Sequence, residues 1–205
     1  MDKQLKVFIL IAVMVILFLG WHLCPENDKI ENFQTENNLL LQFLNHQIYL
    51  KMYIYCVINQ LPNRQEMLEK LLQTQDNMAI AICQLYSQES YIPLATILRS
   101  IMISTVNFAA NFKEDDVDRN RSDYYNIIKR TSITRLYQDI DRLCTYIAKI
   151  SGKDFTKLHR LYTTYFKYVN NMIVAYPYQL FDEEALSTEK ANEAWSKIYD
   201  EISKK

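Results

Sequence analysis

The pattern of apolar and polar positions divides the chain into one long apolar stretch and a series of helical segments. Residues 7–25 read VFILIAVMVILFLGWHLCP and contain no Asp, Glu, Lys or Arg. Beyond residue 34, apolar residues recur every three or four positions, which is the period of one face of an α-helix. The pattern therefore predicts an all-α protein with two parts, an N-terminal apolar helix and a helical bundle.

The apolar stretch is long enough to cross a membrane. Its 19 residues, at about 1.5 Å per residue, span a hydrocarbon core of about 30 Å. Trp21 and His22 lie near its end, where amphipathic rings suit the headgroup layer, and Pro25 is suited to end the helix. We expect a single-pass transmembrane anchor over residues 7–25, preceded by a short tail at residues 1–6.

A cleaved signal peptide is the alternative for this stretch, and it requires small residues before the cleavage site. The bulky Phe18 occupies one of those places, so the pattern favours an uncleaved anchor. Lys3 and Lys6 precede the span and only Lys29 follows it closely. By the positive-inside rule, we expect the N-terminus in the cytoplasm and the bundle on the far side of the membrane.

Residues 26–34 are polar and are expected to form a linker to the bundle domain, which we place at 35–205. In the first bundle helix, predicted from Thr35 to Gln60, a heptad-like seam alternates steps of four and three: Leu39, Phe43, His46, Leu50, Tyr53 and Val57. Further helices are predicted over residues 63–73, 76–86, 91–112, 124–150, 155–175 and 187–203. Four long helices and several short ones predict an antiparallel helical bundle.

Local signals mark several helix ends in this bundle. Pro62 should stop the first bundle helix. Gly152 should end the helix predicted over residues 124–150, and Asp154 should cap the next helix, which starts at residue 155. Residues 176–186 are expected to be irregular, with Ser187 capping the last helix.

Composition and motifs exclude several classes of protein. Two glycines and four prolines in 205 residues are too few for the turns of an all-β chain. The net charge is −1, so we expect no nucleic-acid partner. The sequence shows no glycine-rich phosphate loop and no nucleophile–base pair. We therefore expect no catalytic residues, no cofactor and no enzyme activity.

The cysteines of the bundle carry no metal or redox motif. Cys56, Cys83 and Cys144 fall on three different predicted helices and form no C-x-x-C pair. A compartment beyond the membrane would permit one disulfide. We expect buried free thiols instead, because free cysteine behaves as a small apolar side chain.

The run NHQIYLKMYIYCVINQLPN, at residues 45–63, resembles a family of small bacterial helical-bundle proteins of unestablished function. That family carries a pattern of the form EHxxWTRMxIxSxxxNLPD, and the residues in register with it are His46, Met52, Ile54, Leu61 and Pro62. Weaker similarity extends to Leu71-Leu72, to the helix around residues 79–82, and to Arg135, Tyr137 and Asp141. The resemblance covers most of residues 39–202 and implies a helical bundle rather than an activity.

The resemblance also implies a candidate metal site. The family pattern places Glu and His residues on later helices, where they could meet His46 inside the bundle. Here Ser100 stands in place of the Glu and Tyr165 in place of one His. The remaining candidate ligands are His46, Asp139, Asp141 and Glu201. We favour a neutral core histidine at position 46, hydrogen-bonded to a Tyr or an Asp.

The surplus of tyrosine has two interpretations, which are packing in the core and at its boundary, or a surface that contacts another protein. The chain has 15 tyrosines, and residues 176–181 are apolar yet predicted irregular, which suits docking on a partner or on the bundle's own end. We expect a non-enzymatic structural or interaction protein whose anchor holds the bundle at a membrane. A membrane-to-shell tether or minor component in the internal membrane of a large virus particle is one concrete form. The alternative is a metal- or small-molecule-binding bundle centred on His46.

Overall fold

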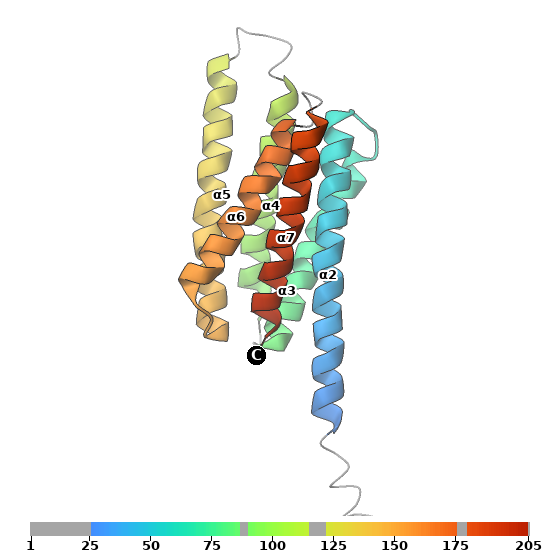
Figure 1. Cartoon of the computed structure of the whole chain (residues 1–205), viewed down its shortest axis with the longest axis vertical. Helices are drawn as coiled ribbons and strands as arrows, with labels where there is room; N and C mark the ends of the chain where they lie inside the picture. The colour runs from blue at the N-terminus through green and yellow to red at the C-terminus, as the bar shows by residue number, and fades with distance from the viewer. Residues whose placement is uncertain (1–25, 87–89, 115–121, 176–179, 205) are drawn as a thin grey trace, which may run out of the picture.

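The computed structural model describes residues 26–86, 90–114, 122–175 and 180–204, and all regular structure in these ranges is helical. The helices are α2 (Glu26–Ile58), α3 (Arg64–Leu85), α4 (Ile92–Glu114), α5 (Ser122–Ser151), α6 (Phe155–Ala175) and α7 (Phe181–Ser203). They run alternately up and down, so helices adjacent in sequence are antiparallel (Figure 1). The predicted all-α helical bundle is confirmed.

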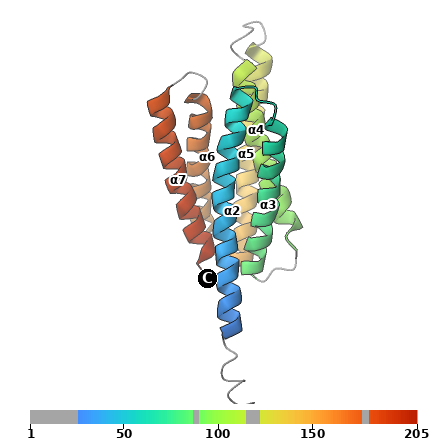
Figure 2. The same cartoon turned by 90° about the vertical axis from the view of Figure 1, so that its right-hand side faces the viewer.

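The bundle consists of three helical hairpins. The most extensive packing joins α2 to α3, α4 to α5, and α6 to α7. In Figure 2, α2 stands in front, with α6 and α7 on one side and α3 on the other. α4 contacts four helices, α2, α3, α5 and α6, so it is the central element of the bundle.

The central position of α4 explains its composition. Its stretch Ile92–Ala110 is the one described helical segment long and apolar enough to cross a membrane, and 61% of it is buried inside the bundle. A helix surrounded by four others is apolar on most sides for packing reasons alone. The transmembrane helix expected over residues 7–25 lies outside the described residues, and so does the tail at 1–6.

The predicted seam of the first bundle helix is confirmed. All six of its side chains are buried in the core: Leu39, Phe43, His46, Leu50, Tyr53 and Val57. The helix itself is longer than expected, because α2 begins at Glu26 and the residues expected as a linker, 26–34, are helical. The first turns of α2 extend beyond the end of the bundle (Figures 1 and 2).

The break expected within α3 is absent, and the prediction of two short helices is wrong. The two residues between the predicted helices, Thr74 and Gln75, hydrogen-bond to backbone carbonyls of α3. Thr74 Oγ1 donates to the Lys70 carbonyl at 2.8 Å, and Gln75 Nε2 donates to the Leu71 carbonyl at 3.1 Å. Both side chains are buried, so tertiary packing outweighs the weak helix propensity of the local sequence.

The last helix also begins earlier than predicted. α7 starts at Phe181, so residues 181–186 are helical and Ser187 is a buried side chain within the helix rather than its cap. Asp182, Glu183 and Glu184 occupy its first turn. Acidic side chains there are favoured by the partial positive charge of a helix N-terminus.

Two predicted helix ends are confirmed in atomic detail. Gly152 follows α5 with a φ of +70°, a left-handed conformation that glycine adopts without a steric penalty, and its N–H donates to the Ala148 carbonyl at 2.9 Å. Asp154 Oδ1 accepts a hydrogen bond from the Lys157 backbone N–H at 2.9 Å, as an N-cap does. These ends set the tight turn between α5 and α6.

Candidate functional site

His46, on α2, lies among side chains from α3, α6 and α7, and only 1% of its surface is exposed. Its Nε2 lies 2.8 Å from the Tyr165 hydroxyl oxygen on α6. Its Nδ1 lies 3.0 Å from Gln75 Nε2 on α3. Both ring nitrogens of this α2 residue therefore have partners from other helices.

The contacts of Gln75 determine the tautomer of His46. The Leu71 carbonyl oxygen can only accept, so the Gln75 atom that faces it is the amide nitrogen. The same nitrogen donates its other N–H to Nδ1 of His46. Nδ1 is therefore the acceptor, and Nε2 carries the proton and donates it to the Tyr165 hydroxyl oxygen.

Burial keeps this histidine neutral. Removal from water disfavours the charged imidazolium and lowers the pKa of His46 from 6.5 to about 3. Burial likewise raises the pKa of the Tyr165 hydroxyl, so both members of the pair are uncharged at pH 7. The prediction of a neutral core histidine hydrogen-bonded to a tyrosine is confirmed.

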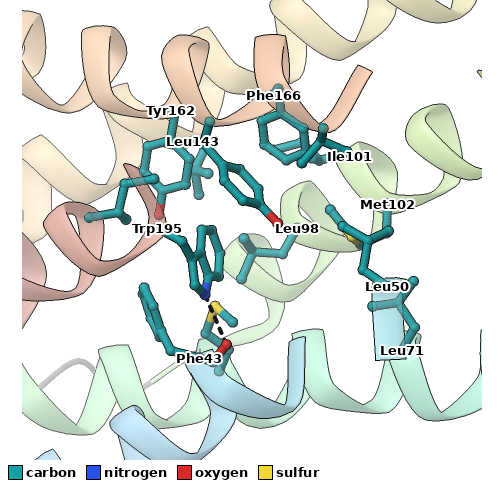
Figure 3. Packing of buried hydrophobic residues seen from close by; sticks show 14 of the residues in the cluster. Phe43, Leu50, Leu71, Leu98, Ile101, Met102, Leu143, Tyr162, Phe166 and Trp195 are labelled. Carbon is teal, nitrogen blue, oxygen red and sulfur yellow. Dashed lines mark hydrogen bonds between the residues drawn. The ribbon is translucent and has the colours of Figure 1, made fainter. Parts of the chain in front are cut away.

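The indole of Trp195, from α7, covers one face of His46. The ring centroids lie 4.2 Å apart, with 23° between the planes. Trp195 also stacks on Phe43 at 4.6 Å and donates its Nε1–H to the Phe43 carbonyl at 2.8 Å (Figure 3). The group of His46, Gln75, Tyr165, Trp195 and Phe43, here called the His46 cluster, thus joins α2, α3, α6 and α7.

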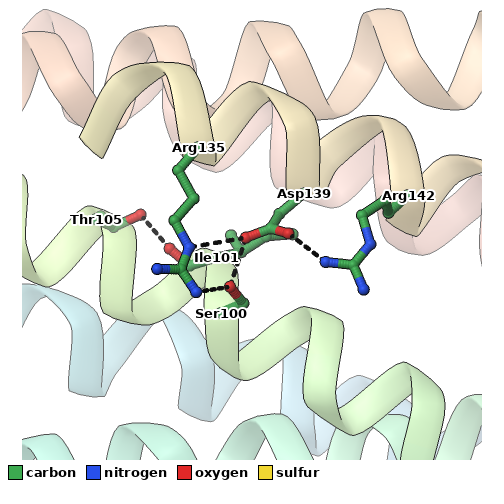
Figure 4. A network of polar contacts seen from close by, with 6 residues as sticks. All are labelled: Ser100, Ile101, Thr105, Arg135, Asp139 and Arg142. Atoms are coloured by element: carbon green, nitrogen blue, oxygen red, sulfur yellow. Dashed lines mark hydrogen bonds and ion pairs between the residues drawn. The ribbon is translucent and has the colours of Figure 1, made fainter. Parts of the chain in front are cut away.

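A second polar cluster joins α4 to α5 around Asp139, which is only 3% exposed. Ser100 Oγ donates to Asp139 Oδ2 at 2.5 Å, and Arg142 Nη1 lies 2.9 Å from Oδ1. Arg135 lies on the other side, with its Nε 4.0 Å from Oδ2 (Figure 4). Both guanidinium groups are exposed at the edge of the bundle, and their positive charges balance the negative charge of the buried carboxylate.

The other two candidate metal ligands have separate partners. Asp141 Oδ1 lies 2.9 Å from Nε2 of His159, and Glu201 Oε2 lies 2.5 Å from Nζ of Lys157. Within the described ranges, no group of three or more His, Cys, Asp or Glu side chains is placed to hold a metal ion. Metal binding at His46 is the alternative to a core histidine, and metal analysis of the untagged full chain tests it.

The bundle cysteines match their expected state. Cys56, Cys83 and Cys144 are buried and free. Burial is the larger of two causes that raise the pKa of Cys144 to about 12, the other being the charge of Asp141. The Cys144 thiol therefore stays protonated at pH 7, and the thiolate is the reactive form of cysteine.

The second apolar face of α2 is a feature that the sequence prediction missed. Six side chains there are 39–52% exposed, and we call them the α2 stripe: Leu40, Leu41, Leu44, Ile48, Met52 and Tyr55. From Asn38 to Asn63, the chain has a single charged residue, Lys51. The scarcity of charge on a helix with a solvent-facing side was the signal available in the sequence.

The end of the bundle where α7 begins carries further exposed apolar side chains. Phe181 is 68% exposed, and Leu180 and Leu186 are exposed beside it in sequence. Of the apolar segment predicted to dock on a partner, residues 176–179 lie outside the described residues. α7 begins at the end of the bundle opposite to the one from which α2 extends (Figure 1).

Comparison of the chain with known protein families, with curated proteins and with solved structures finds no match. The resemblance of residues 45–63 to a bacterial helical-bundle family therefore stays a prediction.

Proposed function

We propose that the protein is a non-enzymatic, membrane-anchored interaction protein. Residues 7–25 hold the chain in a membrane as a single-pass helix with its N-terminus in the cytoplasm, and the bundle binds a protein partner in a larger assembly. A tether between the internal membrane and the shell of a large virus particle is the concrete form of this proposal.

The observation that carries the proposal is that the two ends of the bundle differ. α2 begins directly after the apolar stretch and extends from one end of the bundle, whereas the exposed Leu180, Phe181 and Leu186 belong to the opposite end (Figure 1). A tether needs this arrangement, because its membrane end and its partner end must be separated. Exposed aromatic and aliphatic side chains are typical anchors of protein interfaces.

The polar groups of the interior support a structural role. A general base works best with a pKa near the operating pH, whereas His46 has a pKa of about 3 and both of its ring nitrogens are engaged. Asp139 is held by Ser100 and Arg142. The contacts of His46 and Asp139 hold neighbouring helices together. This structural role explains why both polar side chains are buried, and no catalytic role is needed.

The membrane part of the proposal is tested by replacing Val13 and Ile16 with Arg in the full chain. Each charge near the helix centre costs about 2.5–3.5 kcal/mol on insertion scales. We expect the double variant to leave the membrane pellet on carbonate washing, while the Leu double variant at the same positions stays in it. Retention of the Arg variant would show that residues 7–25 are not the anchor.

The partner part is tested by placing a photo-crosslinking amino acid at Phe181 in the full chain, within its native membranes. We expect a discrete product with one other protein. The matched control is Ile92, which is similarly exposed but begins α4 at the opposite end of the bundle. Identical products from both positions, or none from Phe181, would contradict a partner at the α7 end.

A further inference from the structure

We propose that the α2 stripe packs against the α2 stripe of a second copy of this chain, forming a parallel two-helix interface. The inference goes beyond the proposed function, because it concerns the side of the bundle and not the end that faces a partner protein.

The exposure of the α2 stripe is unusual for a solvated surface. Contiguous exposed apolar patches mark interaction sites in soluble domains, and the six side chains of the stripe follow one another along four turns of one helix. In Figure 2, α2 stands in front of its neighbours, and no described helix covers its outer side. The outer side of α2 can therefore receive a second helix.

The spacing of the apolar residues in the stripe suits packing against another helix rather than binding to a flat surface. Leu41, Leu44, Ile48, Met52 and Tyr55 are separated by three, four, four and three residues, a mean step of about 3.5. That is the period at which two helices keep a shared seam in contact along a left-handed supercoil. The buried seam of α2 already packs with this spacing against the bundle, so the same helix offers a second seam on its outer side.

The charge of α2 favours a copy of itself over a different protein. A parallel, in-register pair places each residue beside its own copy, so any charge on the seam would repel. Lys51 is the single charge from Asn38 to Asn63, and it lies at the edge of the stripe, where its exposed ammonium can turn away from the seam into water. Helices that select a different partner carry complementary charges beside the seam, whereas the stripe is flanked by uncharged polar residues, Asn45 and Gln47 among them.

The position of α2 favours a parallel pair. Its first turns extend beyond the bundle, so a second α2 can run beside it there without meeting other helices (Figure 1). A parallel arrangement also places both 7–25 segments at the same end. If both segments lie in one membrane, as the proposed function holds, the two chains are concentrated in a common layer, which favours association without any new contact.

The first experiment is cysteine crosslinking of the full chain in detergent. Ile48→Cys, in a Cys24→Ser background, should form a disulfide-linked dimer on mild oxidation, because the two copies of residue 48 meet at the seam. Ile103→Cys is the matched control, since Ile103 is similarly exposed on α4. Equal crosslinking at both positions, or none at Ile48→Cys, would overturn the proposal.

The second experiment measures the mass of the full chain by sedimentation in detergent at micromolar concentration. We expect twice the chain mass of 24.4 kDa for the wild type, and a single chain mass for the Leu44→Glu/Ile48→Glu double variant. The Ile103→Glu/Leu186→Glu double variant, altered at two other exposed apolar positions, should remain a dimer. Circular dichroism checks that each variant is folded, and the crosslinking result stands independently if one is not.

Two other occupants of the stripe are outcomes that would overturn the inference. A monomeric wild type that loses binding to phosphatidylcholine vesicles on the double Glu change would assign the stripe to a lipid surface. A monomeric wild type whose Ile48→Cys form crosslinks to another protein would assign it to that protein. Because the mass is measured in detergent, the result does not depend on the carbonate extraction that tests the anchor.

Discussion

The two apolar faces of α2 are built from similar residues at a similar spacing, yet the other described helices cover only one of them. The buried face packs against the bundle and includes Phe43 and His46, whereas the outer face presents Leu44, Ile48 and Met52 to solvent. The period of a helix shows which residues share a face, but it does not show which face the rest of the chain covers.

The two faces also differ in their polar content. The inner face carries His46, whose ring nitrogens are satisfied by Gln75 and Tyr165. The outer face carries the exposed Lys51, whose long side chain can keep its charge in water, and the half-buried amides of Asn45 and Gln47 flank it. A second copy can cover such a surface with no buried polar group left unsatisfied, provided that the Lys51 ammonium reaches water at the edge of the seam.

The strongest test of this difference is Phe43→Ala on the inner face. Removing a buried aromatic ring costs about 3–5 kcal/mol, and here the stacking on Trp195 is lost as well. Urea unfolding of the full chain should show this loss, whereas Lys51→Ala, an exposed change on the same helix, should stay within about 0.5 kcal/mol. Similar costs for the two variants would show that the inner face is not part of the core.

The next effect is the pH dependence that His46 imposes. Its pKa is about 3 in the folded chain and near 6.5 when unfolded, so the unfolded chain binds the extra proton between these values. The free energy of unfolding should therefore be unaffected by His46 above pH 6.5. Below that pH its contribution should fall by about 1.4 kcal/mol per pH unit, until it levels off near pH 3.

The matched variant for this prediction is His46→Gln, which cannot titrate. We expect it to be less stable than the wild type at pH 7 but to lose less stability on acidification. A chelator should leave the thermal midpoint of the wild type unchanged. A large chelator-induced drop that is absent from His46→Gln would make His46 the centre of a metal site and reverse our interpretation of the inner face.

The smallest effect concerns the outer face of α2. Met52→Gln exchanges side chains of similar length at an exposed position, so the folded single chain should change in stability by less than about 0.5 kcal/mol. The same change should weaken the dimer, because it places two amides in an apolar seam. Thermal unfolding at several protein concentrations separates these effects, since only the dimer makes the midpoint depend on concentration. A midpoint that rises equally with concentration in wild type and variant would place the interface elsewhere.

The helices themselves could largely be predicted from the sequence, because their signals are local. The seam from Leu39 to Val57 follows from the helical period, and Gly152 and Asp154 act within a few residues of the ends they mark. The same local reasoning failed at Ser187, where a good capping residue lies inside a helix. A residue such as Ser can cap a helix, but tertiary packing decides where the helix begins.

The partners of the buried polar groups were decided by tertiary structure alone. His46 was expected to bond to a Tyr or an Asp, and the tyrosine is Tyr165, which lies 119 residues away in sequence. Its second partner, Gln75, lies 29 residues away and was not predicted. Ser100 meets Asp139 across 39 residues. A hydrogen bond between distant residues leaves no periodic signal in a single sequence, because it depends on how the helices pack rather than on how each one forms. The apolar stretch at 7–25 is the opposite case. Its prediction as a membrane helix depends only on its length and its lack of charge, and both are properties of the sequence.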